Sequence, residues 1–508
     1  MNSKFNILSI IILLFVVITS CDNSLKGDFN ENQIPTTFLT VDKIDREGDF
    51  RLSSQINISW WGNDPDGYII GYEYAINDTL EGDWTFTKKT DSTFILPITV
   101  GLAEDNVLFK IRAVDNDEAR DPIGARLVFP IVNSAPSVSI NTTEVPPDSL
   151  FSIASFGWTV NDSDGLANIV STQVAINDTV NGWVSIPFTT EDDGRIFISL
   201  ELDNTIAGEQ EAEVFLGRSY TRALNNAGQP LTVPNLEVGS KNTFYVRAID
   251  AAGAVSEVDT VSWYLKAQNS KVLFINDYGA SSSLTKQSQH VNYLNQIGIQ
   301  PDVWLINTGA VTQDKIALSD KFPSVIDPTL KKTLAKWDHI YWISDDIDRN
   351  ITYALDITSE FFTNGGTMFV NIPMKTISQE DEIFNFLPVD SIGVLNAGSI
   401  QTGFVLNGNT DVLPEEGISD VVAKTQSRRV GVVPIKAVAG STLLYQTDFR
   451  TTTLIGSTQD YTRFEGVGVE NQERDLIYFS LDLINIDGNN NVPDLLNDLL
   501  IGRLNFKQ

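Results

Sequence analysis

The chain repeats itself, and this internal repeat limits its fold more than any other feature of the sequence. The run WWGNDPDG at 60–67 returns as WTVNDSDG at 158–165, and the run AINDT at 75–79 returns unchanged at 175–179. The two offsets are 98 and 100 residues, and a period of about 100 residues is the length of one small domain. The sequence therefore predicts two related domains in tandem.

The two copies also end alike, but at a different offset. FKIRAVD at 109–115 matches FYVRAID at 244–250, which lies 135 residues later. The second copy thus carries an insertion of about 35 residues, which we expect within 201–237. The predicted domains span 35–133 and 134–267.

Both copies have the residue pattern of half-buried strands. Phe109, Ile111 and Ala113 alternate with Lys110 and Arg112, which gives one apolar and one polar face. Short strands of this kind, separated by turn residues, predict an all-β sandwich in each copy. A further strand is expected to place its alternate residues on one face: Tyr68, Ile70, Tyr72, Tyr74 and Ile76.

The C-terminal part, 271–508, has a different pattern. Apolar strands are predicted at 272–275, 303–306, 339–343 and 367–372, with helices at 283–297 and 351–362 between them. Strands that alternate with helices are typical of an α/β domain with a mostly parallel sheet. The inward face of the first helix is expected to carry Leu284, Val291, Leu294 and Ile297.

The repeated domains resemble the fibronectin type III family. The run YVRAIDAAG at 245–253, followed by Ser256, is similar to the late strand and turn of that family. Trp60 and Trp158 then fall where the family places a core tryptophan of an early strand. The resemblance covers roughly 35–267 and implies an immunoglobulin-like sandwich used for adhesion, spacing or recognition.

The C-terminal domain resembles the class I glutamine amidotransferase-like fold. The resemblance rests on WDHIYWIS at 337–344, FFTNGGTMFV at 361–370, DLIYFSLD at 475–482 and the helical segment 493–504. Active members use a cysteine nucleophile on a strand-to-helix elbow. Here the expected elbow reads NIPM at 371–374, and the domain contains no cysteine. The resemblance therefore implies the scaffold without the activity.

The first 20 residues resemble an export signal. Lys4 precedes an apolar run at 7–18 that is too short to cross a bilayer as a helix. The following run ITSC at 18–21 resembles the lipobox of bacterial lipoproteins and contains the single cysteine of the chain, Cys21. We expect lipidation of Cys21, a flexible tether at 21–34, and anchoring to the outer membrane or cell surface of a Gram-negative bacterium. An ordinary signal peptide and an unprocessed anchor are the alternatives.

The charge balance excludes one class of partner. The chain has 35 Lys and Arg against 66 Asp and Glu, a net charge of −31. Binding to a phosphate backbone requires clustered cations. We therefore expect no nucleic-acid partner.

Polar residues follow two of the predicted strands, where ligands gather in open α/β sheets. If the strands at 272–275 and 339–343 are neighbours, their carboxyl ends bring the side chains together. Carboxylates there would bind Mg²⁺ or Ca²⁺, or hydrogen-bond sugar hydroxyls. Helix caps and turns are the alternative role for the same residues. The candidates are Asn276, Asp277, Ser344, Asp345 and Asp346.

Two repeated acidic turns are a second candidate site. Asp64 and Asp66, and likewise Asp162 and Asp164, would supply oxygen ligands to Ca²⁺. Tight turns built from Asp, Pro and Gly are the alternative, since neither copy has the spacing of an EF-hand.

Two tryptophans and two histidines also have alternative roles. Trp84 and Trp183 recur in both copies and would either stack on sugar rings or pack against the sandwich. His339 lies within a predicted strand and His290 within a helix, so a structural role is expected for His339 and no catalytic triad is complete around His290.

The sequence thus predicts a lipid-anchored exported protein of three domains that acts by binding, with a glycan or an envelope protein as ligand. One alternative is an extracellular hydrolase that uses Asp277, Asp345 and Asp346 of the C-terminal domain either as metal ligands or as acid/base groups. A structural spacer is the other.

Overall fold

The computed structural model describes residues 31–507, apart from short gaps and one longer gap. Cys21 and the predicted export signal lie outside the described residues. None of the helices described is long and apolar enough to cross a membrane. The segments left out are 42–45, 48–50, 53, 78–83, 100, 189–192, 280–282, 307–327 and 396–399.

The chain divides into two compact units. The first comprises Met1–Ser134 with Ser163–Gly165, and the second comprises Ala135–Asp162 with Leu166–Gln508. The second repeat and the C-terminal domain thus share one unit.

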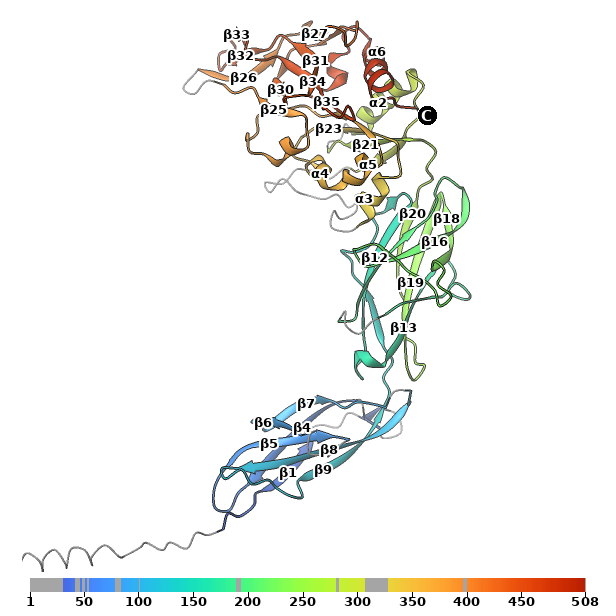
Figure 1. Ribbon diagram of the computed structural model, residues 1–508, viewed down its shortest axis with the longest axis vertical. Coiled ribbons are helices and arrows are strands. Elements are labelled where there is room, and N and C mark those ends of the chain that lie inside the picture. Colours follow the sequence, from blue (N-terminus) through green and yellow to red (C-terminus); the bar gives the residue numbers. More distant parts are fainter. Residues whose placement is uncertain are drawn as a thin grey trace, which may run out of the picture. The chain divides into compact units, whose positions relative to one another are not determined.

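The first repeat forms a sandwich of two sheets (Figure 1). One sheet has the strand order β1-β4-β7, and the other has the order β2-β3-β9-β8-β5-β6. The bounds are β1 (Thr36–Val41), β2 (Arg46–Glu47), β3 (Arg51–Leu52), β4 (Gln55–Asn63), β5 (Ile69–Ile76), β6 (Thr85–Thr87), β7 (Asp91–Ile95), β8 (Glu104–Asp115) and β9 (Ala125–Val132).

Alternation along β8 builds the core between these sheets. Phe109, Ile111 and Ala113 are fully buried, as their spacing predicts, and Trp60 from β4 is 2% exposed among them. The prediction for Tyr68 is wrong, because this residue precedes β5 and is 68% exposed. The register of β5 also shifts between Ile69 and Gly71, so alternation does not extend back to Tyr68.

The second repeat has the same two-sheet plan (Figure 1). One sheet has the order β10-β12-β15-β16-β17, with β18 also paired to β16, and the other has the order β11-β20-β19-β13-β14. The insertion forms β16 to β18, which extend the first of these sheets. The bounds are β10 (Ser137–Ile140), β11 (Ser149–Leu150), β12 (Ile153–Asn161), β13 (Ile169–Ile176), β14 (Val184–Ile186), β15 (Arg195–Glu201), β16 (Gly208–Leu216), β17 (Thr221–Arg222), β18 (Thr232–Val238), β19 (Ser240–Asp250) and β20 (Asp259–Leu265).

The C-terminal domain is built on a mixed sheet. Its order is β22-β21-β23-β24-β35-β34-β31-β27-β28, and the pairs from β22 to β35 are parallel. The expectation of a mostly parallel sheet is corrected here, because the pairs beyond β35 are antiparallel. The strands between 389 and 470 follow one another without the crossover helices that parallel pairing requires.

The strand bounds of this domain are as follows: β21 (Val272–Asp277), β22 (Asp302–Leu305), β23 (His339–Ser344), β24 (Thr367–Asn371), β25 (Val389–Ile392), β27 (Asp411–Pro414), β28 (Ala423–Lys424), β30 (Ile435–Ala437), β31 (Thr442–Thr447), β34 (Gly466–Glu470) and β35 (Leu476–Phe479). A separate four-stranded sheet has the order β29-β26-β32-β33. Its strands are β26 (Gln401–Leu406), β29 (Arg429–Val430), β32 (Arg450–Thr453) and β33 (Thr458–Asp460).

Helices are short apart from α2 (Ser283–Gln296). Leu294 is buried on α2 as predicted, but Leu284 is 62% exposed, because the inward face begins with Ser283 and continues through His290. The helix predicted at 351–362 is broken into η3 (Asn350–Tyr353), α4 (Ala354–Ile357) and α5 (Ser359–Thr363). The remaining helical bounds are α3 (Pro328–Leu334), η4 (Glu382–Asn385), η5 (Leu483–Ile486), α6 (Val492–Leu496) and η6 (Asn497–Arg503).

Candidate functional site

The structure brings the predicted strand-end residues together. β21 and β23 are parallel neighbours, and Asp277 lies opposite Ser344 in their register. Two of the five side chains then serve the local backbone. The Asn276 amide donates to the carbonyl of Ser283 at the start of α2 at 3.2 Å, and the Ser344 hydroxyl donates to the carbonyl of Asp277 at 3.1 Å.

Asp277 is fully buried. One carboxylate oxygen accepts a 2.7 Å hydrogen bond from the Asn350 amide. Burial raises the pKa of Asp277 well above its usual range, although the Asn350 hydrogen bond, the Arg349 charge and the Trp342 indole each oppose this shift. The interior therefore favours the neutral carboxylic acid.

Cations already occupy the space beside the other carboxylates. Arg349 donates to Asp345 at 2.7 Å with its side chain 6% exposed. Lys375 lies between Asp346, at 2.6 Å, and Asp348, at 2.8 Å. Among the described residues no group of three acidic, histidine or cysteine side chains is arranged to hold a metal ion. Asp345, Asp346 and Asp348 are thus held in ion pairs.

The acidic turns of the repeats fasten the chain that precedes them. Asp66 accepts a hydrogen bond from the backbone N–H of Gln33 at 3.0 Å, and Asp164 accepts one from that of Ser134 at 2.6 Å. Asp162 is 5% exposed, and burial is the main cause of a raised pKa at Asp64. Backbone N–H donors are thus among the partners of these carboxylates, and the prediction of calcium turns stays a prediction.

The repeated tryptophans are covered by arginines. The guanidinium carbon of Arg112 lies 4.1 Å from the centre of the Trp84 ring, and Arg247 lies 4.1 Å from that of Trp183. Trp183 also donates to the carbonyl of Thr179 at 2.8 Å. One face of each indole is therefore occupied by a cation, which favours the packing role over sugar stacking.

Both histidines are held by neighbours. His339 pairs with the Thr367 hydroxyl at 2.8 Å and stacks on Phe506. His290 is fully buried and pairs with the Tyr341 hydroxyl at 2.9 Å. Burial lowers the pKa of His290 to about 4, so the ring is neutral near pH 7.

The segment expected to carry a nucleophile elbow is filled by structural contacts. The Asn371 amide donates to the carbonyls of Phe479 and Leu481, at 3.0 and 2.6 Å, and Ile372 and Met374 are fully buried. No described side chain at 371–374 offers a nucleophile in place of cysteine.

The joint between the second sandwich and the C-terminal domain is a site that the sequence analysis missed. Phe151, from the sandwich, packs edge-on against Trp304 at 5.6 Å and Trp337 at 4.7 Å between ring centres. All three side chains are at most 3% exposed. A single hydrophobic core thus runs from the sandwich into the α/β sheet.

Polar contacts surround this aromatic cluster. Lys336 forms an ion pair with Glu201 of the sandwich, and Lys266 donates to the carbonyl of Val303. Burial raises the pKa of Glu201, but Lys336 and the Tyr220 hydroxyl outweigh burial and hold it below its usual value. The two domains are therefore joined by both apolar and charged contacts.

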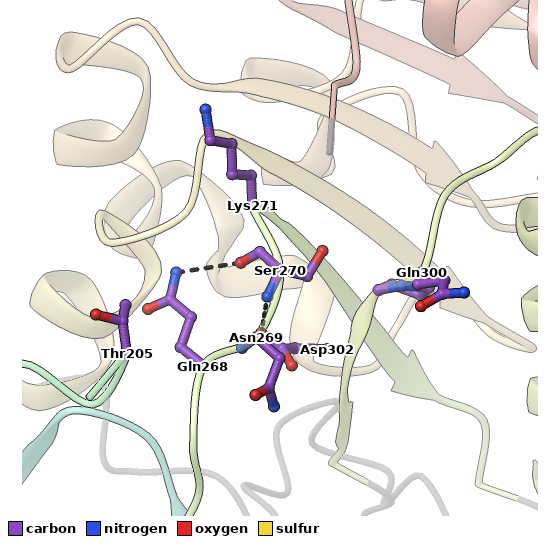
Figure 2. A pocket seen from close by; sticks show the side chains of 8 residues that line it. Thr205, Gln268, Asn269, Ser270, Lys271, Gln300 and Asp302 are labelled. Atoms are coloured by element: carbon purple, nitrogen blue, oxygen red, sulfur yellow. Dashed lines mark hydrogen bonds between the residues drawn. The ribbon is translucent and has the colours of Figure 1, made fainter. Parts of the chain in front are cut away.

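Two adjoining polar cavities open at this joint. The first has a volume of about 800 Å³ and the second about 520 Å³, and they share Thr205 and Gln268. Figure 2 shows the first cavity, where Asp302 accepts hydrogen bonds from the backbones of Asn269 and Ser270 at 2.9 and 3.0 Å. We call the two cavities together the joint groove. Its lining comprises Ser152, Glu201, Leu202, Asp203, Asn204, Thr205, Glu211, Glu213, Arg222, Gln268, Asn269, Ser270, Lys271, Gln300, Pro301, Asp302 and Lys336.

The groove depends on the insertion in the second repeat. Glu211 and Glu213 lie on β16 and Arg222 on β17, and all three line the second cavity. The change of the offset between the two repeats from 100 to 135 residues marks the insertion, and it is the sequence signal that could have predicted this wall of the groove. None of the strand-end candidates lines either cavity.

Comparison with known proteins gives partial similarities. No family model and no curated protein matches the chain. Fibronectin(III)-like modules of Clostridium thermocellum CbhA are 17% identical, with a TM-score of 0.15 over 45% of this chain and 95% of theirs. A two-domain fibronectin type III segment of chicken tenascin is 10% identical, with a TM-score of 0.19 over 46% of this chain and 99% of its own.

A third similarity concerns the other predicted fold. The glutaminase domain of Trypanosoma brucei CTPS, solved with bound acivicin, is 11% identical, with a TM-score of 0.27 over 45% of this chain and 93% of its own. Identities and TM-scores this low transfer no function to this chain.

Proposed function

We propose that this chain is an exported, lipid-anchored binding protein that holds a polar ligand in the joint groove. The anchor is the acylated Cys21 expected from the sequence. The observation that supports the binding role is the joint groove itself. Its first cavity has a volume of about 800 Å³ and is lined by the second sandwich, the linker and the C-terminal domain.

The lining suits a ligand rich in hydroxyls and amides. Asn269 and Gln300 each present an exposed carboxamide, which both donates and accepts hydrogen bonds, whereas the Gln268 amide already donates to the carbonyls of Ser270 and Lys336. Lys271 and Asp302 add one charge of each sign. A glycan or a polar segment of an envelope protein has the matching groups.

The rigid joint supports this role. Phe151, Trp304 and Trp337 fix the sandwich wall of the groove against the α/β wall. A preformed groove binds without the entropic cost of ordering its walls.

Exposed amides allow a direct test. The double variant Asn269→Ala/Gln300→Ala removes two carboxamides from the groove, and both residues are exposed. The full chain in detergent is immobilised and exposed to solubilised cell envelopes, and the retained glycans and proteins are identified. We expect a ligand that the wild type retains and the double variant loses.

The matched control is Gln229→Ala/Gln426→Ala, which removes two exposed amides outside the groove. The control is expected to behave as the wild type does. Equal retention by all three proteins would contradict the groove as the binding site. In parallel, Cys21→Ala is expected to move the protein from the membrane to the soluble fraction.

The spacer alternative rests on the same rigid joint. It predicts that no ligand depends on the groove, so the same experiment separates the two functions.

A further inference from the structure

Two aromatic side chains form an exposed stacked pair on the first sandwich, far in sequence from the joint groove. Phe38 on β1 lies directly opposite Trp61 on β4 in the antiparallel register. Their ring centres are 5.3 Å apart and their planes differ by 15°. Phe38 is 42% exposed and Trp61 is 50% exposed.

The sheet around the pair is almost without charge. On β1 and β4 the exposed positions that flank the pair are Thr36, Thr40 and Asn63, which are polar and neutral. Asp91 on β7 lies opposite Ser59 and is the one charged residue in the three strands, and the exposed Lys88 and Lys89 precede β7. In a chain with 20% charged residues and a net charge of −31, this face is complementary to an uncharged ligand rather than to a cationic one.

The second repeat provides an internal comparison. The equivalent strands β10 and β12 pair in the same way, and Ser139 lies opposite Thr159 where the first repeat has Phe38 and Trp61. The sandwich therefore forms without an aromatic pair at this position. Cross-strand aromatic pairs do stabilise sheets, but the fold itself does not require this one.

The chemistry of the face points to one class of ligand. Pyranose rings present C–H groups that pack on aromatic faces, and their hydroxyls pair with amides and hydroxyls. Each ring of a stacked pair keeps one face that the other ring does not cover. We propose that the Phe38–Trp61 face of the first sandwich binds a neutral polysaccharide. This site is separate from the joint groove and does not depend on the function proposed for it.

The test is affinity electrophoresis of the full chain in non-denaturing detergent gels that contain hydroxyethyl cellulose, xylan, galactomannan or dextran. At least one of these neutral polysaccharides is expected to retard the wild type. The variant Phe38→Ser/Trp61→Thr, which installs the residues of the second repeat, is expected to bind at least about tenfold more weakly, a change of about 1.4 kcal/mol. Trp61→Thr alone replaces the double variant if thermal melting shows that the latter is unfolded.

The control is Phe86→Ser, which removes an aromatic residue that is 49% exposed on β6 of the opposite sheet. It is expected to leave the retardation unchanged. The proposal is wrong if no polysaccharide in the panel retards the wild type, or if the Phe38 and Trp61 variants are retarded as the wild type is. It is also wrong if sedimentation shows a wild-type dimer that these variants dissociate, since the face would then bind a second copy of the chain. The retardation by polysaccharides does not depend on whether the Asn269→Ala/Gln300→Ala variant loses groove ligands. Each of the two proposals can therefore be contradicted without the other.

Discussion

Arg247 places its guanidinium carbon 4.1 Å from the ring centre of Trp183. The first repeat has the same relationship at the same distance between Arg112 and Trp84. Each arginine comes from the long second-to-last strand of its repeat, β8 or β19. The repeated tryptophans are thus parts of a cation–π contact on the sheet surface, which explains their recurrence without a ligand.

Replacing Arg247 with alanine is expected to destabilise the second sandwich. The cation–π contact contributes about 0.5–2 kcal/mol, and the Arg247 side chain also donates to Gln173 at 2.9 Å. Urea unfolding measures the loss, and acrylamide quenching reports the newly uncovered Trp183 ring. Lys241→Ala on the same strand is the control, because Lys241 is exposed. Equal stability of the two variants would contradict the structural role of the contact.

Replacing Phe151 with alanine is expected to weaken the joint. The side chain is 1% exposed between Trp304 and Trp337, and removal of a buried phenylalanine costs about 3–5 kcal/mol. Because the substitution leaves a cavity between the second sandwich and the α/β domain, we expect calorimetry to resolve a separate unfolding transition for each of them. Phe86→Ala at an exposed site should cost far less. A single transition at the wild-type temperature would contradict the role of Phe151 in joining the two domains.

The stability of the C-terminal domain is expected to fall in mild acid because of His290. Burial lowers the pKa of this histidine from 6.5 to about 4. As the pH falls, His290 is therefore protonated in the unfolded chain before it is protonated in the folded chain. Stability is therefore full above pH 6.5 and declines as the pH falls toward 4, by up to about 3 kcal/mol from this group. The variant His290→Gln should show a shallower decline when unfolding is measured between pH 7 and pH 4. His339, whose pKa burial also lowers, contributes in the same direction and remains in the variant. An unchanged slope would rule out His290 as the source.

Metal titration decides between the ion-pair network and a metal site at the strand ends. The alternative hydrolase predicts that Asp277→Ala/Asp345→Ala lowers the affinity for Mg²⁺ or Ca²⁺. We expect no change in calorimetric titration, because Arg349 and Lys375 already neutralise Asp345 and Asp346. A clear drop in affinity relative to the wild type would restore the metal-site hypothesis.

Local patterns predicted much of the fold. Alternation identified the buried face of β8, and the apolar runs located β21, β23 and β24 to within one or two residues. These features follow from periods of two residues in strands, which need no knowledge of distant contacts. The inward position of Leu284 on α2 and the mostly parallel sheet were predicted wrongly, since both depend on what the element packs against.

For the candidate sites too, only the features that follow from local sequence patterns could be predicted. The strand-end residues were expected to meet if β21 and β23 were neighbours, and these two strands do pair in parallel. The ion pair of Asp346 with Lys375 could not be predicted, since Lys375 lies 29 residues from Asp346 in sequence. The exposed pair of Phe38 and Trp61 likewise depends on strand register, which joins residues 23 positions apart.

By itself, the sequence determined the repeat, the insertion in its second copy, the expected lipidation at Cys21 and the absence of a cysteine nucleophile from the C-terminal domain. Only the tertiary structure decided which charges neutralise one another, which aromatic side chains stay exposed, and that the insertion walls a groove against the next domain. The reason is physical. Composition and periodicity act within a few residues along the chain, whereas ion pairing, exposure and cavities depend on which distant residues the packed core brings into contact.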